Sequence, residues 1–214
     1  MGVCMLSRPT AREEIENSVS HGIGLLAAIA VAPFLIASAA SGGSAQTIVG
    51  ASVFSATMVL LYLSSTLYHA LPAPSAKRVL RTVDHAAIFL LIAGTYTPFT
   101  LGVLSGAWGW TLFGLVWTLA LAGVLLETFG RMRYPKLSLA LYIGMGWLVL
   151  IAAKPMIQLM QPWGLFWLVA GGVAYTAGVA FYAAKRIPHH HLIWHLFVIA
   201  GTACHVVAVL RYAA

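Results

Sequence analysis

Seven long apolar runs, almost free of charged residues, constrain this chain more than any other feature. A helix that crosses a bilayer needs about 20 apolar residues, and runs of that length fill most of the 214 residues. Short segments rich in Gly, Pro and Ser separate them, and the weakest break is Ser105-Gly106. We therefore predict an all-α, polytopic membrane protein built as a seven-transmembrane helix bundle. The predicted spans are 20–40, 46–70, 84–104, 108–129, 136–156, 163–184 and 189–210.

The composition excludes several classes of protein. Of all residues, 61% are hydrophobic and 8% are charged, against about 45–50% and about 25% in soluble domains. A soluble enzyme and a disordered tail are therefore excluded. The net charge of +7 comes from Lys and Arg scattered between apolar runs, which form no basic face, so we expect no nucleic-acid partner. With only Cys4 and Cys204, the chain can build neither a disulfide scaffold nor a cysteine zinc site.

The distribution of Lys and Arg predicts the orientation of the chain in the membrane. With a cytoplasmic N-terminus, only Lys154 and Arg211 of the twelve basic residues lie outside. Because basic residues gather on the cytoplasmic side, we predict the N-terminus inside and the C-terminus outside. Residues 1–19 would be a cytoplasmic juxtamembrane segment and 20–214 a single transmembrane domain. The ten inside residues are Arg8, Arg12, Lys77, Arg78, Arg81, Arg131, Arg133, Lys136, Lys185 and Arg186.

The first apolar run has a second interpretation as a secretory signal, with Ala37-Ser38-Ala39 as its cleavage site. The segment before this run is long and contains three acids, Glu13, Glu14 and Glu16. Both properties are unlike the short basic start of a signal peptide, so we favour a membrane span.

Ionisable residues within membrane spans are costly and are therefore candidates for function. His191 and His195 lie four residues apart at the start of the last span. On a helix this spacing puts their Cβ atoms about 5–6 Å apart, which suits two ligands of one metal ion. The alternative is a basic interfacial cluster, since His189 and His190 precede them.

Three further residues gain meaning from the predicted topology. His69, four residues after Ser65, ends the second span, and Asp84 starts the third. Taken alone, His69 could be an interfacial histidine and Asp84 a helix N-cap. In the bundle, however, both reach the cytoplasmic depth of His191 and His195. Three histidines with an open fourth position form a catalytic zinc site, and a nearby carboxylate can activate the water.

Other polar residues fall outside this set. His205 lies about 15 Å beyond His195 along a helix, so it cannot share the same ion and is interpreted as a buried, hydrogen-bonding histidine. The residues Glu14, Asn17, His21 and Gly24 form one helical stripe. This stripe is either a solvated turn or a polar surface that packs against the cytoplasmic mouth of the bundle. A kink is expected at Pro98.

Four ordered blocks of the sequence resemble the haemolysin III-related family, within the progestin and adipoQ receptor superfamily. The resemblance covers essentially the whole chain, and any one block alone is weak. The short form of the chain is similar to bacterial members, and the long N-terminal domain of the animal receptors is lacking. The blocks are Glu14 to Gly24, Ser65 to His69, Asp84 to Phe99, and His191 to His205.

The resemblance implies seven helices in a bacterial inner membrane, with a cytoplasmic N-terminus and a Zn²⁺ ion. The zinc ligands would match His69, His191 and His195; Asp84 would contact the zinc-bound water, and Ser65 is a supporting candidate. Hormone sensing is not carried over.

The first hypothesis for function is a zinc-dependent hydrolase of a lipid amide or ester, similar to a ceramidase, in membrane lipid homeostasis. Its partner would be a membrane lipid or fatty-acyl substrate, with no obligate protein partner. The second is a non-enzymatic homeostasis or sensor protein with structural zinc. The third, a cytolytic haemolysin, conflicts with the sequence because seven apolar spans offer no water-soluble state.

Overall fold

The structure, a computed structural model, describes residues 9–42, 44–130 and 135–213, and the regular elements in this part of the chain are all helices. Seven segments are long and apolar enough to cross a membrane, the fifth being Leu137–Leu159. The all-α, seven-helix fold is therefore confirmed. The elements are α1 (Ala11–Ser41), α2 (Ala45–Ala70), α3 (Pro74–Leu101), α4 (Ala107–Thr128), α5 (Pro135–Gly146), the 3-10 helix η1 (Leu148–Ala152), α6 (Ala153–Leu159), α7 (Pro162–Ala183) and α8 (His190–Tyr212).

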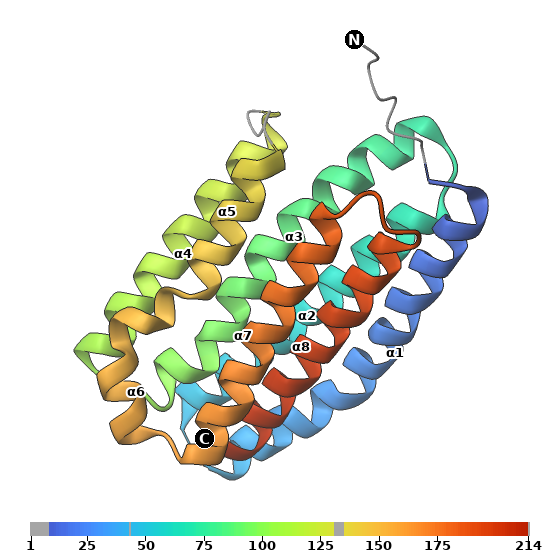
Figure 1. The fold of residues 1–214 in the computed structure, drawn as a ribbon. Coiled ribbons are helices and arrows are strands. Elements are labelled where there is room, and N and C mark those ends of the chain that lie inside the picture. The colour runs from blue at the N-terminus through green and yellow to red at the C-terminus, as the bar shows by residue number, and fades with distance from the viewer. Residues whose placement is uncertain (1–8, 43, 131–134, 214) are drawn as a thin grey trace.

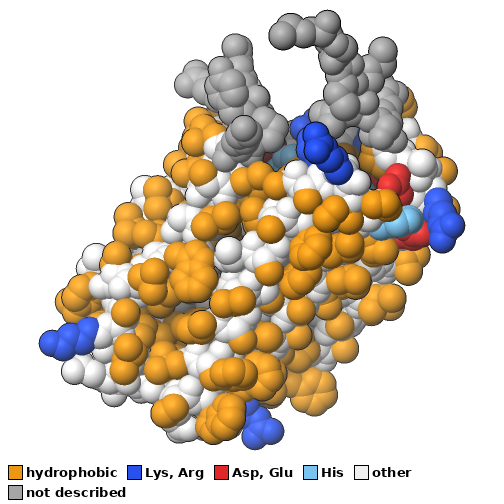
Figure 2. Space-filling view, viewed as in Figure 1, with side chains coloured by type: hydrophobic (Ala, Val, Ile, Leu, Met, Phe, Trp, Pro, Cys, Tyr) orange, Lys and Arg blue, Asp and Glu red, His pale blue; other side chains and the backbone are white. Residues whose placement is uncertain are grey.

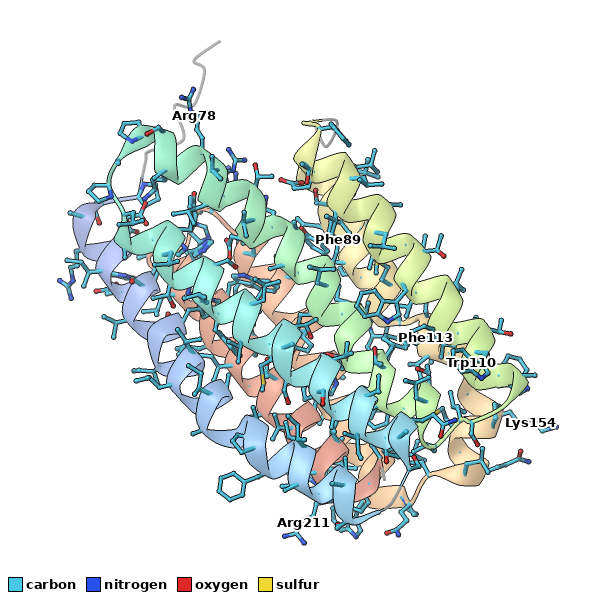
Figure 3. The ribbon with its side chains drawn as sticks, turned by 180° about the vertical axis from the view of Figure 1, so that it is seen from behind. Arg78, Phe89, Trp110, Phe113, Lys154 and Arg211 are labelled. Atoms are coloured by element: carbon cyan, nitrogen blue, oxygen red, sulfur yellow. The ribbon has the colours of Figure 1, made fainter. Side chains whose placement is uncertain are left out.

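The helices form one elongated bundle, with α1 along one side and α4 and α5 along the other (Figure 1). Sequential helices α1 to α4 pack against one another, α7 packs on α8, and α8 also contacts α1. Hydrophobic side chains cover most of the surface seen in Figure 2. Figure 3 places Arg78 at one end of the bundle and Lys154 and Arg211 at the other, as the predicted orientation requires.

Two helices begin earlier than the apolar runs suggest. The α1 helix starts at Ala11 because Thr10 and Glu13 form a capping box, in which the Thr10 N–H donates to Glu13 Oε2 at 2.8 Å. The α3 helix starts at Pro74, a residue suited to a first helical position. Asp84 therefore lies inside a helix, and its interpretation as an N-cap is wrong.

The predicted fifth span is not one continuous helix. It breaks after Gly146 into η1 and α6, and the Tyr96 side chain of α3 binds the freed backbone groups. The Val149 N–H donates to the Tyr96 hydroxyl at 2.9 Å, and this hydroxyl lies 2.8 Å from the Gly146 carbonyl. Backbone groups in a membrane need such internal partners. Pro98, where a kink was expected, lies in the last turn of α3.

Candidate functional site

Three histidines from two helices meet near the end of the bundle where α1 begins. His69 lies at the end of α2, and His191 and His195 lie in the first turns of α8. Their potential ligand atoms are all within 4.8 Å of one another, and the ring centroids are 4.6–5.2 Å apart. His69 and His195 are buried and His191 is partly buried. This triad could hold a metal ion, because three imidazoles are a common ligand set.

The surroundings of His69 fit a metal ligand. Its Nδ1 lies 2.7 Å from Glu14 Oε2, and an ionised carboxylate only accepts, so Nδ1–H is the donor. The neutral ring therefore leaves Nε2 as a bare acceptor. This atom is buried and has no hydrogen-bond partner among the described residues. An orphaned buried nitrogen calls for an explanation, and a metal ion would supply it.

His195 is held in the same way. Its Nδ1 lies 3.2 Å from the Asn17 carbonyl and 3.0 Å from Ser20 Oγ. A carbonyl only accepts, so Nδ1–H donates and Nε2 remains free. Histidines that bind metals usually donate their other ring N–H to a carboxylate or carbonyl. The residues present thus fit a metal ion, although histidine nitrogen also suits metals other than zinc.

The polar stripe at the start of α1 faces these histidines. Asn17 and His21 are buried, and the His21 ring stacks on His195 with ring centroids 3.5 Å apart. Glu14 also accepts a hydrogen bond from Lys77 Nζ at 2.7 Å. The interpretation of this stripe as a solvated turn is therefore wrong; it packs against the triad.

Asp84 and Ser65 lie close to the triad but outside it. Asp84 is 8% exposed and is not one of the three clustered ligands. Ser65 lies beside the Asp84 carboxylate, and both line the cavity that His191 and His195 border. The Asp84 side chain is thus one of the few ionisable groups that line the cavity.

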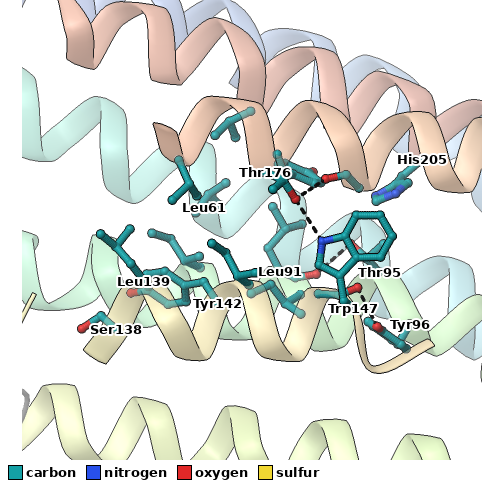
Figure 4. A pocket seen from close by; sticks show the side chains of 18 of the residues that line it. Leu61, Leu91, Thr95, Tyr96, Ser138, Leu139, Tyr142, Trp147, Thr176 and His205 are labelled. Atoms are coloured by element: carbon teal, nitrogen blue, oxygen red, sulfur yellow. Dashed lines mark hydrogen bonds between the residues drawn. The ribbon is translucent and has the colours of Figure 1, made fainter. Parts of the chain in front are cut away.

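The cavity has a volume of about 570 Å³, a size typical of small-ligand sites. Its wall is mostly apolar and comes mainly from α3, α5, α7 and α8 (Figure 4). It extends from Arg81 and Lys185 to Leu104, which follows the far end of α3. A hydrocarbon chain would therefore meet apolar side chains along most of its length.

His205 borders the same cavity but is not part of the triad. Its Nε2 donates to the Leu168 carbonyl at 3.1 Å, and its ring lies 5.4 Å from that of Tyr175. The structure thus places His205 as a buried, hydrogen-bonded side chain between α7 and α8.

Several residues near the site did not emerge from the sequence. Ser20 and Lys77 contact His195 and Glu14, as described above, and His85 Nδ1 lies 3.1 Å from Glu127 Oε1. The spacing of Glu127 and Arg131 predicts an i,i+4 ion pair, but Arg131 lies outside the described residues. Arg81 could have been identified from the sequence as a residue near the site, because it precedes Asp84 by three residues and so shares its side of α3.

Comparison with known proteins gives a consistent result. A family model described as "Haemolysin-III related" matches residues 10–206. The chain is 47% identical to "Hemolysin-3 homolog" of Bacillus subtilis (strain 168), covering 95% of both chains. It is 43% identical to "Hemolysin-3" of Bacillus cereus, covering 94% of this chain and 92% of that one.

A more distant relative is human "Monocyte to macrophage differentiation factor", with 27% identity over 96% of this chain and 86% of that one. No solved structure matches the chain. The residues matched by the family model include the three histidines and Asp84. The chain therefore belongs to the haemolysin III-related family.

Proposed function

We propose that this membrane protein is a zinc-dependent hydrolase that cleaves an amide or ester bond of a membrane lipid. The observation that carries the proposal is the histidine triad, two of whose members, His191 and His195, line a mostly apolar cavity together with Asp84. A zinc ion held by three histidines keeps a position for water, lowers the pKa of that water to about 7 and polarises a carbonyl oxygen.

The residues of the chain would then perform three tasks. The apolar wall would hold the acyl chain and exclude bulk water from the reacting carbonyl. Asp84 would accept a proton from the attacking water at its carboxylate, with Ser65 orienting that carboxylate. As the bond from the carbonyl carbon to nitrogen or oxygen breaks, Asp84 would return the proton to the leaving amine or alcohol. The products are a fatty acid and that amine or alcohol.

The test is lipid hydrolysis by the purified protein, followed by mass spectrometry of the released fatty acid. We expect loss of release in His191→Ala and in Asp84→Asn, and little change in His190→Ala. His190 is a matched control because it adjoins His191 but is not one of the clustered ligands. Equal release by the wild type and His191→Ala would defeat the proposal.

A second candidate function, membrane homeostasis or sensing with a structural metal, is favoured by the origin of the ligands. His69 comes from α2 and the other two from α8, and these helices make few direct contacts. A metal ion would therefore also link two helices. Asp84→Asn separates the two candidates. If the protein is a hydrolase, this variant loses activity but keeps its metal. If the metal is structural, the variant keeps both its metal and its function in membrane homeostasis or sensing.

The name of the Bacillus cereus relative, "Hemolysin-3", suggests cytolysis as a third candidate. A secreted toxin needs a water-soluble state. Seven apolar helices cannot form such a state without a large rearrangement. We therefore do not favour cytolysis for this chain.

A further inference from the structure

We propose that the charged mouth of the cavity binds the anionic group, a carboxylate or a phosphate, of an amphiphile whose hydrocarbon chain occupies the cavity. We define the mouth by Arg81, His85, Glu127 and Lys185, which all line the cavity together with Asp84 and His191. The inference rests on the proposed function in one respect: the anion would belong to the half of the substrate that leaves.

The two cations of the mouth, Arg81 and Lys185, form no salt bridge in the part of the chain that the structure describes. Arg81 and Lys185 are exposed and form no salt bridge with the acids of the described residues, which include all five acids of the chain. Glu127 is hydrogen-bonded to His85, and Asp84 is buried beside Ser65. Two exposed cations thus line the cavity without a salt bridge to either of the two carboxylates, Asp84 and Glu127, that line it as well.

The remaining acids are engaged elsewhere. Glu13 caps α1, Glu14 binds His69 and Lys77, and Glu16 binds Arg12 and His189. None of these three lines the cavity. Arg81 and Lys185 are therefore available to pair with an anion from solvent or from a ligand.

The order of groups along the cavity gives the ligand a direction. Arg81 lies three residues before Asp84 on α3, which is about 4.5 Å of helix rise, and Lys185 lies six residues before His191. The cations and the triad therefore share one end, and the apolar wall leads away from them toward Leu104. A carbonyl held at the triad would point its long chain inward and a short, anionic leaving part outward.

This geometry selects a substrate class. The leaving part must be short and must carry a negative charge within a few bonds of the cleaved amide or ester. N-acyl amino acids offer a carboxylate in that position, and lysophosphatidic acids offer a phosphate. Both anions bind arginine and lysine through charge-assisted hydrogen bonds.

A simpler role for the same cations is to orient the chain in the membrane, since both belong to the basic inside set. Two neighbours allow the roles to be separated. Arg78 precedes Arg81 by three residues, and Arg186 follows Lys185; both are exposed and basic, yet neither lines the cavity. Orientation alone would make these four residues equivalent.

The experiment measures ligand binding by the full-length protein in phosphatidylcholine nanodiscs. The probes are dodecyl phosphate, laurate and the uncharged monolaurin, whose twelve-carbon chains are equal in length. The protein carries His191→Ala, so that neither an intact metal site nor hydrolysis contributes to binding. We expect the anionic probes to bind more tightly than monolaurin, with the preferred anion revealed by the comparison of phosphate and laurate.

Arg81→Gln and Lys185→Gln should each weaken binding of the preferred anion about tenfold, the effect of losing one charged hydrogen bond. The same changes should leave monolaurin binding unaltered, which shows that the cavity is still folded. Arg78→Gln and Arg186→Gln should change neither the binding of the preferred anion nor the binding of monolaurin. Equal binding of all three probes, or equal losses in all four variants, would overturn the inference.

The binding result is independent of the proposed hydrolysis. If the protein cleaves no lipid but binds anionic probes selectively, the proposed function fails and the anion site stands. If it cleaves uncharged lipid amides and shows no preference for charge in binding, the anion site fails and the proposed function stands.

Discussion

At the scale of single residues, Glu14 connects the N-terminal end of α1 to the candidate metal site. One carboxylate oxygen accepts from His69 Nδ1–H at 2.7 Å and the other accepts from Lys77 at 2.7 Å. The first bond selects the tautomer of His69 that presents Nε2 to the triad. The second holds the carboxylate in place. Together they orient a ligand that two χ angles would otherwise leave free to turn.

We predict that Glu14→Gln lowers the affinity for zinc about 10- to 100-fold, the usual effect of losing a partner that orients a metal-binding histidine. The measurement is competition for zinc with a chelator of known affinity, using protein in detergent. Glu13→Gln is the matched control, because Glu13 lies next in the chain and its carboxylate, within the described residues, bonds only to Thr10. Equal zinc affinity in Glu14→Gln and Glu13→Gln would show that Glu14 has no such role.

The residue-level predictions from sequence depended on the scarcity of ionisable residues in this chain. A chain with five acids and eight histidines leaves few ionisable groups to place within the membrane, so His69, Asp84, His191 and His195 stood out. Ser20 and Lys77 did not, because serine and lysine are common at membrane boundaries. Their roles depend on the register of α1 against α8 and α3, which no spacing within one helix reveals.

At the scale of elements, the break in the fifth span shows what hydropathy leaves undetermined. The segment Leu137–Leu159 is long and apolar enough to cross a membrane, which predicts a span but not its continuity. Gly144, Gly146 and Pro155 were the available signals, since glycine and proline weaken helices. The partner that stabilises the break, Tyr96, lies on α3 and is distant in sequence.

We predict that Tyr96→Phe destabilises the protein by about 1–3 kcal/mol, because the Val149 N–H would lose its partner in a membrane interior. Unfolding of the protein in detergent measures the change, and hydrogen exchange at Val149 should become faster. Tyr212→Phe, on the last turn of α8, is the control for removal of a hydroxyl. Unchanged exchange at Val149 would mean that another group satisfies this N–H.

The starts of α1 and α3 illustrate a second limit at this scale. Apolar runs identify the part of a helix that contacts lipid, but the helix itself continues until a capping group ends it. For α1 that group is Thr10 with Glu13, a pattern readable in the sequence as Thr-x-x-Glu. Extending the helix to Ala11 brings Glu14 and Asn17 onto the same surface as His21, which explains why the polar stripe reaches the triad.

At the scale of the whole molecule, the candidate site lies at the same end of the bundle as most of the basic residues. Arg78 lies at one end of the bundle, and Lys154 and Arg211 lie at the other (Figure 3). The triad and the cavity mouth lie near the end that carries most of the basic residues. If that end faces the cytoplasm, as basic residues favour, the polar leaving part of a substrate would be released there.

We predict that the C-terminus lies outside and the N-terminus inside. Alkaline phosphatase, which folds to an active form only after export, should be active when fused after Ala214 and inactive when fused after Gly130. A fusion after Gly106 should be active and serves as the internal reference. If the fusion after Gly130 is active and the fusion after Ala214 is inactive, the topology is reversed and the triad lies on the outer side.

The central claim is that His69, His191 and His195 hold a metal ion, and its most direct test is the metal content of the purified protein. The protein should carry no affinity tag and meet no immobilised-metal column, because His189 and His190 adjoin the triad. Elemental analysis should find about one zinc per chain in the wild type and in Asp84→Asn, as expected for a three-histidine site, and almost none in His69→Ala or His195→Ala. Wild-type protein without metal, or His69→Ala with a full complement of zinc, would contradict the claim.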